Sequence, residues 1–328
     1  MANVLCCALS FGQTVTKDGL CFLIYGDRAA VAMPEDQDME SCEIPQYVEC
    51  DGHRHLVDSI CDNAFKDCGS LTAVAMPTTV TKWGVGLFQD CESLVSVNIP
   101  DSVTTLESTF DGCASLVSVT IPNTVKSLES AFMGCASLSS VTIPSSVTSL
   151  DYAFYGCTSL SSVTVPSGVE SLTWAFAGCT NLTSVILPSS VTTLDCTFYG
   201  CASLSSVTVP SAVASLVCAF DECPSMSALY MLPTTVPYWE GWDTTIYSSC
   251  KVYVPQGCLD DYKNAEGWSD FYDIQEFETT GVRHATSDID DAKAKAWYGL
   301  NGQTLNVPAK GVNIVRMSDG NTMKVVVK

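Results

Sequence analysis

The chain has 328 residues, with 15 Lys and Arg against 36 Asp and Glu, which gives a formal net charge of −21. Nucleic acids and anionic lipid surfaces bind proteins through basic patches, so this charge argues against both as partners. No apolar stretch reaches the ~18 residues of a membrane-spanning helix, so no membrane-spanning segment is expected.

The N-terminal part of the chain is interpreted as a cap on the repeat array that follows it at residues 61–223. Residues 1–12 contain a short apolar run, Val4 to Gly12, but no Lys or Arg precedes it, so it is at most a residual signal segment. Residues 13–60 are expected to form the N-terminal cap. Within it, Cys42 to Pro45 has the same pattern as the short strands of the repeats that follow. Asp51-Gly52 predicts a tight β-hairpin turn.

Residues 61–223 are the most regular part of the chain. A Phe followed three residues later by a Cys occurs eight times between Phe65 and Cys223, with one step of 23 residues and then six of 22. The cysteines of this column are Cys68, Cys91, Cys113, Cys135, Cys157, Cys179, Cys201 and Cys223. Such a fixed period is typical of a solenoid, in which each coil buries its apolar side only by stacking on its neighbours. We therefore expect one elongated repeat array with caps.

One coil can be interpreted in detail. Val141-Thr142-Ile143 alternates apolar and polar residues and is followed by Pro144, so it predicts a short strand with one buried face. The pattern recurs at Val74, Val97, Val119, Val163, Val185 and Val207. We expect the strands to stack as one parallel sheet of about ten short strands. A Gly directly before the column Cys predicts a left-handed backbone at the end of the turn around Phe. These glycines are Gly112, Gly134, Gly156, Gly178 and Gly200.

The column cysteines are expected to be reduced, buried and inert, because Cys packs as a small hydrophobic residue. A hydroxyl in the place of Cys157 is expected to need a partner in this apolar stack, at a cost of about 1–3 kcal/mol. Cys196 and Cys218 share a second column, one period apart. Their Cα atoms should lie about 5 Å apart if the coils stack at strand spacing, so the sequence allows a disulfide between them.

The C-terminal third is less regular. Residues 224–278 are expected to hold irregular last coils, a strand at Lys251 to Val254 and a cap helix from Cys258 to Trp268 that covers the open edge of the stack. Residues 279–295 are polar and acidic and are interpreted as a linker. Residues 296–328 alternate in short runs around Asn-Gly and Asp-Gly turns, which predicts a small β unit.

Catalytic motifs are absent from the sequence. It has only three histidines, no Gly-rich phosphate loop and no Ser/His/Asp order, so we expect no catalytic residues and no cofactor. The one constellation with zinc-ligand chemistry is Cys50, His53, His55 and Cys61. Its spacing fits no zinc finger well and it falls on the predicted hairpin, so an ordinary hairpin without a metal is the preferred interpretation.

Two surfaces of the coils are candidates for binding. The outward strand positions form a Ser/Thr face that includes Thr142 and Thr164 and could equally be a solvated ladder chosen for β propensity. The second candidate lies next to the Phe column and consists of Tyr152, Tyr155, Trp174 and Tyr199. Exposed Tyr and Trp are effective binding residues because they bury large area at low entropy cost, although Tyr152 and Trp174 could simply pack on each other.

The stretch Ala-Phe-Tyr-Gly-Cys-Thr-Ser-Leu-Ser-Ser-Val-Thr-Val-Pro at residues 153–166 resembles the BspA-like, Treponema-type leucine-rich repeats of bacterial surface proteins. The similarity runs from about Ser41 to Phe277, and the C-terminal segment 298–328 resembles the sorting or anchoring tails of such proteins in Bacteroidetes. Most repeats here have 22 residues where the family more often has 23. The resemblance implies a right-handed, leucine-rich-repeat solenoid that is exported and located at the cell surface or secreted.

Three roles are compatible with an exported solenoid that carries these two candidate surfaces. The leading hypothesis is adhesion or protein binding, in which the solenoid recognises an extracellular or host protein. The second is capture of a glycan or peptide for nutrient uptake, which the aromatics Tyr152 and Trp174 would suit through stacking. The third is a structural surface spacer that binds nothing. An enzymatic role is not expected.

Overall fold

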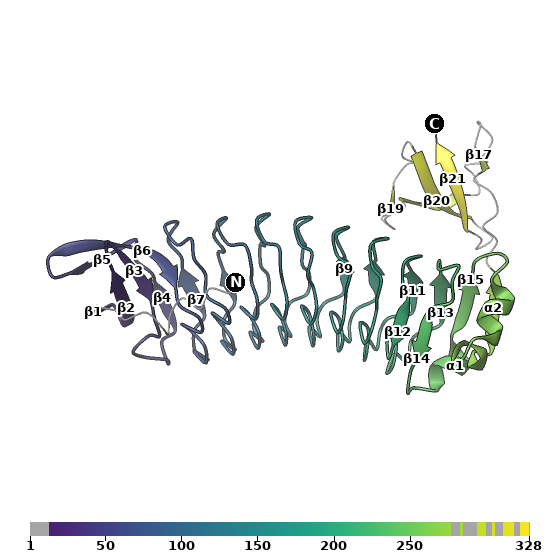
Figure 1. Ribbon diagram of the computed structural model, residues 1–328, viewed down its shortest axis with the longest axis horizontal. Helices are drawn as coiled ribbons and strands as arrows, with labels where there is room; N and C mark the ends of the chain where they lie inside the picture. Colours follow the sequence, from purple (N-terminus) through teal and green to yellow (C-terminus); the bar gives the residue numbers. More distant parts are fainter. Residues whose placement is uncertain are drawn as a thin grey trace.

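The computed structural model describes residues 13–276 and, further along the chain, the backbone of strands at 283–284, 294–299, 304–305, 311–317 and 322–327. Residues 1–12, with the expected residual signal segment, lie outside the described residues. The repeat array is a solenoid of stacked coils, as expected (Figure 1). No helix in this described part of the chain is long and apolar enough to cross a membrane.

A five-stranded sheet covers the N-terminal end of the array. Its order is β1-β2-β3-β6-β5, with β1 Gln13–Lys17, β2 Leu20–Tyr25, β3 Arg28–Val31, β5 Tyr47–Cys50 and β6 His53–Ile60. The β5–β6 hairpin turns at Asp51 and Gly52, whose φ angles of 49° and 76° are both positive, as a type I′ turn requires. Leu20, Phe22 and Val57 of this sheet are fully buried, so the sheet continues the core of the solenoid.

The strand side of the coils forms three parallel ladders in place of the single sheet that the sequence predicts. The first is β4 (Ser41–Glu43), β7 (Ala73–Ala75) and β8 (Ser96–Val97); the second is β9 (Ser162–Thr164) and β10 (Ser184–Ile186); the third is β11 (Ser206–Val209), β13 (Ala228–Met231), β15 (Lys251–Val254) and β16 (Asp273–Glu276). The coils around Val119 and Val141 contain no strand. The expectation of one continuous sheet is therefore corrected.

Backbone hydrogen bonds at the turn around each Phe, here called the Phe turn, explain why a continuous sheet is unnecessary. The N–H of Phe132 donates to the carbonyl oxygen of Ala153 in the next coil (2.9 Å), and the N–H of Gly134 donates to that of Tyr155 (2.7 Å). The same bonds recur from coil to coil. The Phe turns thus supply an inter-coil ladder of their own.

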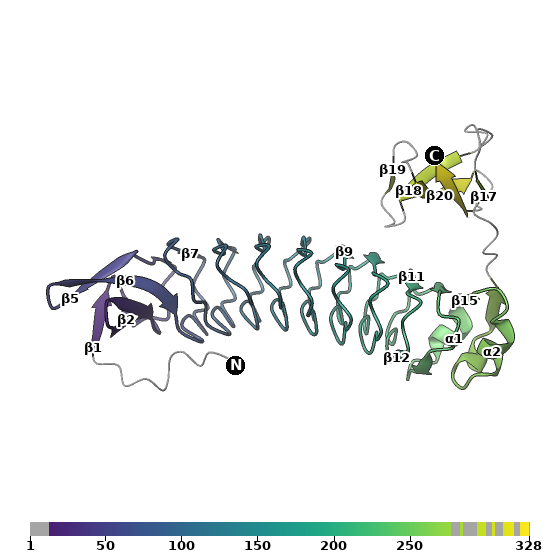
Figure 2. The same ribbon diagram turned by 45° about the horizontal axis from the view of Figure 1, so that its top comes forward.

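A second line of contacts, not expected from the sequence, runs between the strand side and the Phe turns. It consists of single parallel bridges such as Thr105 with Ser127 and Ser171 with Thr193. The line ends in a pair of true strands, β12 (Ser215–Val217) and β14 (Tyr238–Glu240). Each coil is therefore tied to the next at several points along its length, which Figure 2 shows as a regular stack.

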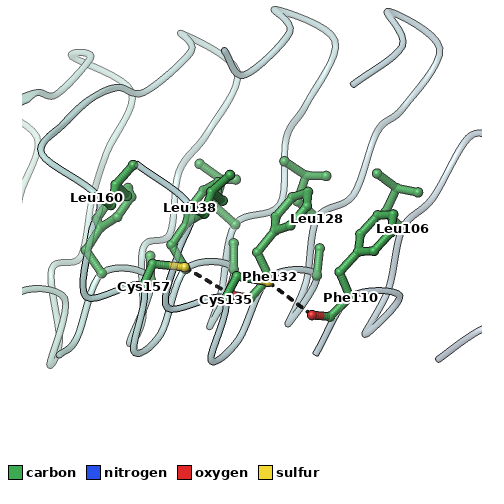
Figure 3. Close-up of a cluster of buried hydrophobic side chains, with 14 of the residues drawn as sticks. Leu106, Phe110, Leu128, Phe132, Cys135, Leu138, Cys157 and Leu160 are labelled. Atoms are coloured by element: carbon green, nitrogen blue, oxygen red, sulfur yellow. Dashed lines mark hydrogen bonds between the residues drawn. The ribbon is translucent and has the colours of Figure 1, made fainter. Parts of the chain in front are cut away.

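The core is a stack of phenylalanine rings beside a ladder of thiols. The rings of Phe65, Phe88, Phe110, Phe132, Phe154, Phe176, Phe198 and Phe220 stack in sequence. Adjacent centroids are separated by 5.4 to 6.0 Å. Each column thiol from Cys91 onward donates to a Phe carbonyl of the preceding coil, as Cys135 does to Phe110 and Cys157 to Phe132, both at 3.1 Å (Figure 3). The column cysteines are buried free thiols, as expected.

The C-terminal end of the array is closed by aromatic side chains. Trp239 continues the Phe stack at 6.2 Å from Phe220 and contacts Trp268 and Phe271. Short helices carry this cap: α1 (Thr245–Ser249), α2 (Leu259–Asn264) and the 3-10 helix η1 (Trp268–Asp270). The indole N–H of the buried Trp268 donates to the carbonyl oxygen of Pro237 at 2.8 Å. The cap therefore covers the last coil without leaving this buried donor unpaired.

The C-terminal segment contains a separate sheet. Its order is β17-β21-β20-β18-β19, with β17 Arg283–His284, β18 Ala294–Gly299, β19 Thr304–Leu305, β20 Gly311–Met317 and β21 Thr322–Val327. β17 and the first residues of β18 fall within residues 279–295, where the sequence predicts a linker, so part of that segment contributes strands to the sheet. The rest of the expected linker lies outside the described residues.

Candidate binding surface on the Phe turns

Four of the six predicted site residues come together in one aromatic cluster, made of Tyr152, Tyr155, Trp174 and Tyr199. Trp174 lies at its centre. Its ring centroid lies 6.3 Å from that of Tyr152, in a nearly parallel arrangement, 6.1 Å from that of Tyr155 and 5.7 Å from that of Tyr199. The four side chains come from three consecutive coils, so only the stacking of the solenoid assembles the cluster.

Two residues of the cluster have an unusual backbone. Tyr152 (φ 59°) and Trp174 (φ 56°) both lie in the left-handed region, which bulky side chains rarely occupy. The equivalent positions of the other regular coils also have positive φ and are Asn63, Gly86, Ser108, Ser130, Cys196 and Cys218. Asn and Gly are the residues that this conformation tolerates best. Tyr152 and Trp174 therefore have a conformational cost that Gly avoids, as the Ser and Cys residues of other coils also do.

A small residue makes room for the central ring. Tyr155, Ala177 and Tyr199 occupy the same position of three successive coils, and Ala177 is fully buried although its neighbours are tyrosines. Trp174 contacts the tyrosines on both sides of Ala177, so its indole occupies the space that a larger residue at 177 would take. Tyr152 and Tyr155 remain 38% and 40% exposed, whereas Trp174 is half-buried. The cluster is thus preformed and open to solvent on its tyrosine side.

Carboxylates surround the cluster. Asp151 precedes Tyr152, and its Oδ1 accepts hydrogen bonds from the hydroxyl of Ser171 (2.8 Å) and the N–H of Thr173 (3.0 Å). The hydroxyl of Tyr199 donates to Glu222. This hydrogen bond, together with burial and the nearby negative charge, raises the pKa of Tyr199 to about 12. Tyr199 is therefore a neutral, oriented ring at physiological pH.

The remaining two predicted site residues lie elsewhere. Thr164 belongs to β9, where it is opposite Ile186 of β10, and Thr142 is an exposed residue of a coil without a strand. Both are part of the strand side, whereas the aromatic cluster belongs to the Phe turns. Within the described residues, no hydrogen bond or ring contact joins the two groups. The predicted residues thus define two surfaces, of which only the aromatic one is assembled by side-chain contacts.

Two further features were outside the predicted site. Cys196 and Cys218 follow Trp174 in the same column and are free thiols that hydrogen-bond to each other. The disulfide that the sequence allows is therefore not formed.

At the C-terminal cap, Trp242 is 77% and Tyr238 59% exposed. Both lie after Cys223, where the repeat register slips, so periodicity gives no signal for them.

Three of the four residues with zinc-ligand chemistry lie in the N-terminal cap, and the fourth, Cys61, directly follows it. Cys50 and His53 face each other across the β5–β6 hairpin. The Nδ1 atom of His55 lies 3.0 Å from the carbonyl oxygen of Gly26, which uses one of the two ring nitrogens inside the protein. In residues 13–276 and the described C-terminal strands, no three His, Cys, Asp or Glu side chains are grouped as a metal site.

Comparison with known proteins identifies the family. The model of the BspA-type leucine-rich repeat region matches six copies over residues 53–152 and 150–240, which is more than half of the chain. The chain therefore belongs to the BspA-type leucine-rich repeat family. No curated protein matches its sequence.

One solved structure shows the same fold, and two others are similar to part of the chain. A leucine-rich repeat protein from Bacteroides ovatus is 25% identical, with a TM-score of 0.62 over 80% of this chain and 67% of that chain. A leucine-rich repeat protein of T. pallidum is 26% identical over 53% of this chain and 81% of that chain, with a TM-score of 0.46. A leucine-rich cell surface protein of Faecalibacterium prausnitzii is 23% identical over 80% of this chain and 72% of that chain, with a TM-score of 0.47. Leucine-rich repeat proteins in general take part in protein–protein interactions.

Proposed function

We propose that this protein is an exported, cell-surface or secreted leucine-rich-repeat protein that binds a macromolecular partner through the aromatic cluster of Tyr152, Tyr155, Trp174 and Tyr199. The partner class that we favour is an extracellular or host protein, and the role is adhesion or recognition. We propose a binding role and not a catalytic one.

The observation that carries this proposal is the contact of three tyrosine rings with Trp174, which brings together four aromatic side chains from three coils. A repeat array needs only one small or flexible residue at the left-handed position, and most coils have one. Two neighbouring coils instead place the large rings of Tyr152 and Trp174 there. All eight coils share the left-handed conformation, so what sets these two apart is the size of the ring that each presents, which supports a binding role.

The proposed location depends on the family. Membership of the BspA-type leucine-rich repeat family supports export to the cell surface, since the resemblance of the repeats is to bacterial surface proteins. The strongly acidic chain is consistent with a soluble, protein-binding surface and does not suit binding to anionic lipid.

A second candidate is capture of a glycan. The rings of Tyr152 and Trp174 are inclined by only 9°, and two nearly parallel rings one coil apart could stack on successive sugar units. A peptide or glycan captured in this way would serve nutrient uptake. We rank this role second because a sugar ring needs a wide open ring face, whereas the half-buried Trp174 keeps only part of its surface exposed.

The test is a pair of screens with the purified chain, one on an extracellular-protein array and one on a glycan array. Each hit is repeated with a double variant, Trp174→Ala with Tyr152→Ala, and with the control pair Thr142→Ala with Thr164→Ala. Protein hits that disappear only with the aromatic double variant support the proposal. Hits that disappear only with the threonine pair place the binding surface on the strand side.

A further inference from the structure

The stretch of sequence that carries the aromatic cluster contains charges of one sign only. Between Lys126 and Lys251 the sequence has no Lys, Arg or His. The acidic residues of this stretch are Glu129, Asp151, Glu170, Asp195, Asp221, Glu222, Glu240 and Asp243. In the part of the chain that the structure describes, every salt bridge uses Arg28, Lys82 or Lys251, and none involves these eight carboxylates. The surface that carries the cluster therefore has a negative field without internal counterions.

Two of these carboxylates lie one coil to either side of Trp174. Asp151 and Asp195 share a column with Thr173, which directly precedes Trp174 in the sequence. The N–H of Trp174 donates to the backbone carbonyl of Asp195 at 3.2 Å, which ties the indole's coil to that of the second carboxylate. The aromatic centre of the site is thus flanked on both sides by negative charge.

Each carboxylate uses one oxygen inside the protein. The Oδ1 of Asp195 accepts from the hydroxyl of Ser215 (2.6 Å) and the N–H of Val217 (3.0 Å), as the Oδ1 of Asp151 does from Ser171 and Thr173. These bonds fix both carboxylates in place. Among the described residues, neither Oδ2 atom accepts a hydrogen bond, so each carboxylate keeps an acceptor for a ligand.

A group that matches both features must be cationic and flat. The face of an aromatic ring attracts cations, Trp most strongly, and Arg is found there more often than Lys. A guanidinium group stacks on rings and donates several hydrogen bonds in a fixed fork to carboxylates, whereas an ammonium group is a strongly hydrated point charge. We propose that the aromatic cluster takes an arginine side chain of the partner protein, with the guanidinium group against the rings and paired with Asp151 or Asp195. This inference rests on the proposed function and names the partner's chemistry.

The test uses two fluorescein-labelled peptides of the same sequence, one with three arginines and one with three citrullines, the neutral isostere of arginine. Their binding to the full chain is measured by fluorescence anisotropy at low and moderate salt. We expect the arginine peptide to bind about tenfold more tightly than the citrulline peptide, with an affinity that falls as salt rises, since cation–ring and charge pairs supply the difference.

Variants separate the parts of the site. Trp174→Leu keeps an apolar side chain but removes the ring face and should weaken arginine-peptide binding about tenfold, whereas Trp174→Phe should keep most of it. Asp151→Asn together with Asp195→Asn keeps the Oδ1 acceptors and should weaken binding and flatten its salt dependence. Glu170→Gln is the matched control, because it removes one charge of the same stretch outside the Phe turn, and should change binding less than about twofold.

Three results would overturn the inference. They are equal binding of the two peptides, full binding by Trp174→Leu, and a loss with Glu170→Gln as large as with the Asp151 and Asp195 pair, which would indicate a nonspecific acidic surface. If the peptides bind equally while the aromatic double variant still abolishes binding of an array hit, the proposed function stands and only the arginine assignment fails. A glycan hit lost with the same double variant overturns the assignment in favour of sugar stacking.

Discussion

The thiol of Cys157 donates a hydrogen bond to the carbonyl oxygen of Phe132, one coil earlier, at 3.1 Å. The same oxygen also accepts from the N–H of Cys135 in its own coil at 3.2 Å. The thiol column is therefore a set of inter-coil hydrogen bonds as well as an apolar stack. A hydroxyl in place of Cys157, which the sequence predicts to need a partner, would have this carbonyl oxygen of Phe132 as an acceptor.

Substitution of Cys157 tests this role. We expect Cys157→Ser to lower the free energy of unfolding by only about 1 kcal/mol, because the hydroxyl keeps the hydrogen bond although the packing of the larger sulfur is lost. Cys157→Ala should lower it by about 2 kcal/mol, because the packing contacts and the hydrogen-bond donor are both lost. Denaturant unfolding measures both values. Cys21→Ser, at a partly exposed thiol, serves as the control and should be nearly neutral. A serine variant less stable than the alanine variant would contradict the role of the hydrogen bond.

Thiol reactivity should differ between the two cysteine columns. Burial raises the pKa of Cys157 to about 12, so its reactive thiolate is scarce at pH 8. Cys196 is partly exposed, and burial with the charge of Asp195 raises its pKa less far. We expect a thiol reagent to label Cys196 in the native protein well before Cys157, with all thiols reacting after denaturation. Mass spectrometry of labelled peptides gives the order, and early labelling of Cys157 is the contrary result.

The left-handed column predicts a stabilising substitution. Ser130 has φ 54°, a conformation that costs a residue with a Cβ about 1 kcal/mol relative to Gly. Ser130→Gly should therefore raise the free energy of unfolding by up to about 1 kcal/mol. Ser139→Gly, at an exposed position without positive φ, should lower it instead. If both glycine variants are destabilised to the same extent, the backbone strain inferred at Tyr152 and Trp174 is absent too.

The N-terminal cap predicts a pH dependence. Asp58 is buried, which by itself raises its pKa, but hydrogen bonds from Tyr25, Arg28 and Ser59 lower the pKa below its usual value. The contribution of this carboxylate is therefore complete above its unfolded pKa of about 3.9 and is lost as pH falls through the lower folded value.

Asp58→Asn isolates that contribution. At pH 7 the variant should be less stable by about 1 to 2 kcal/mol, because an amide accepts weaker hydrogen bonds from Tyr25 and Arg28 than the buried carboxylate does, while the half-exposed Arg28 keeps its contact with water. Between pH 5 and pH 2 the melting temperature of the parent protein should fall further than that of the variant. Parallel melting curves of the two proteins over this pH range would contradict the assignment.

How far the sequence could predict this molecule depends on the kind of contact. The Phe stack, the thiol column and the positive φ at Gly134 follow from a strict period, because stacked coils place equivalent residues side by side. The same logic placed Tyr152 beside Trp174. The contacts of Trp174 with Tyr155 and Tyr199 could not be predicted, because they depend on ring direction and on the space above Ala177.

Other features escape the sequence for a different reason. The break of the strand side into three ladders depends on small shifts in hydrogen-bond geometry that the repeated Ser-Val-Thr pattern does not encode. The Asp58 network joins residues about thirty positions apart without any period. Periodicity thus predicts contacts between equivalent positions well and contacts between different positions poorly.

The central claim is that the aromatic cluster, and not the strand side, carries the binding energy. Its most direct test is the affinity of the double variant Trp174→Ala with Tyr152→Ala for a partner from the protein array, measured beside Thr142→Ala with Thr164→Ala. We predict that the aromatic pair loses more than about 2 kcal/mol of binding free energy, with the array still folded by circular dichroism, and that the threonine pair changes little. Abolished binding with the threonine pair and full binding with the aromatic pair would contradict it.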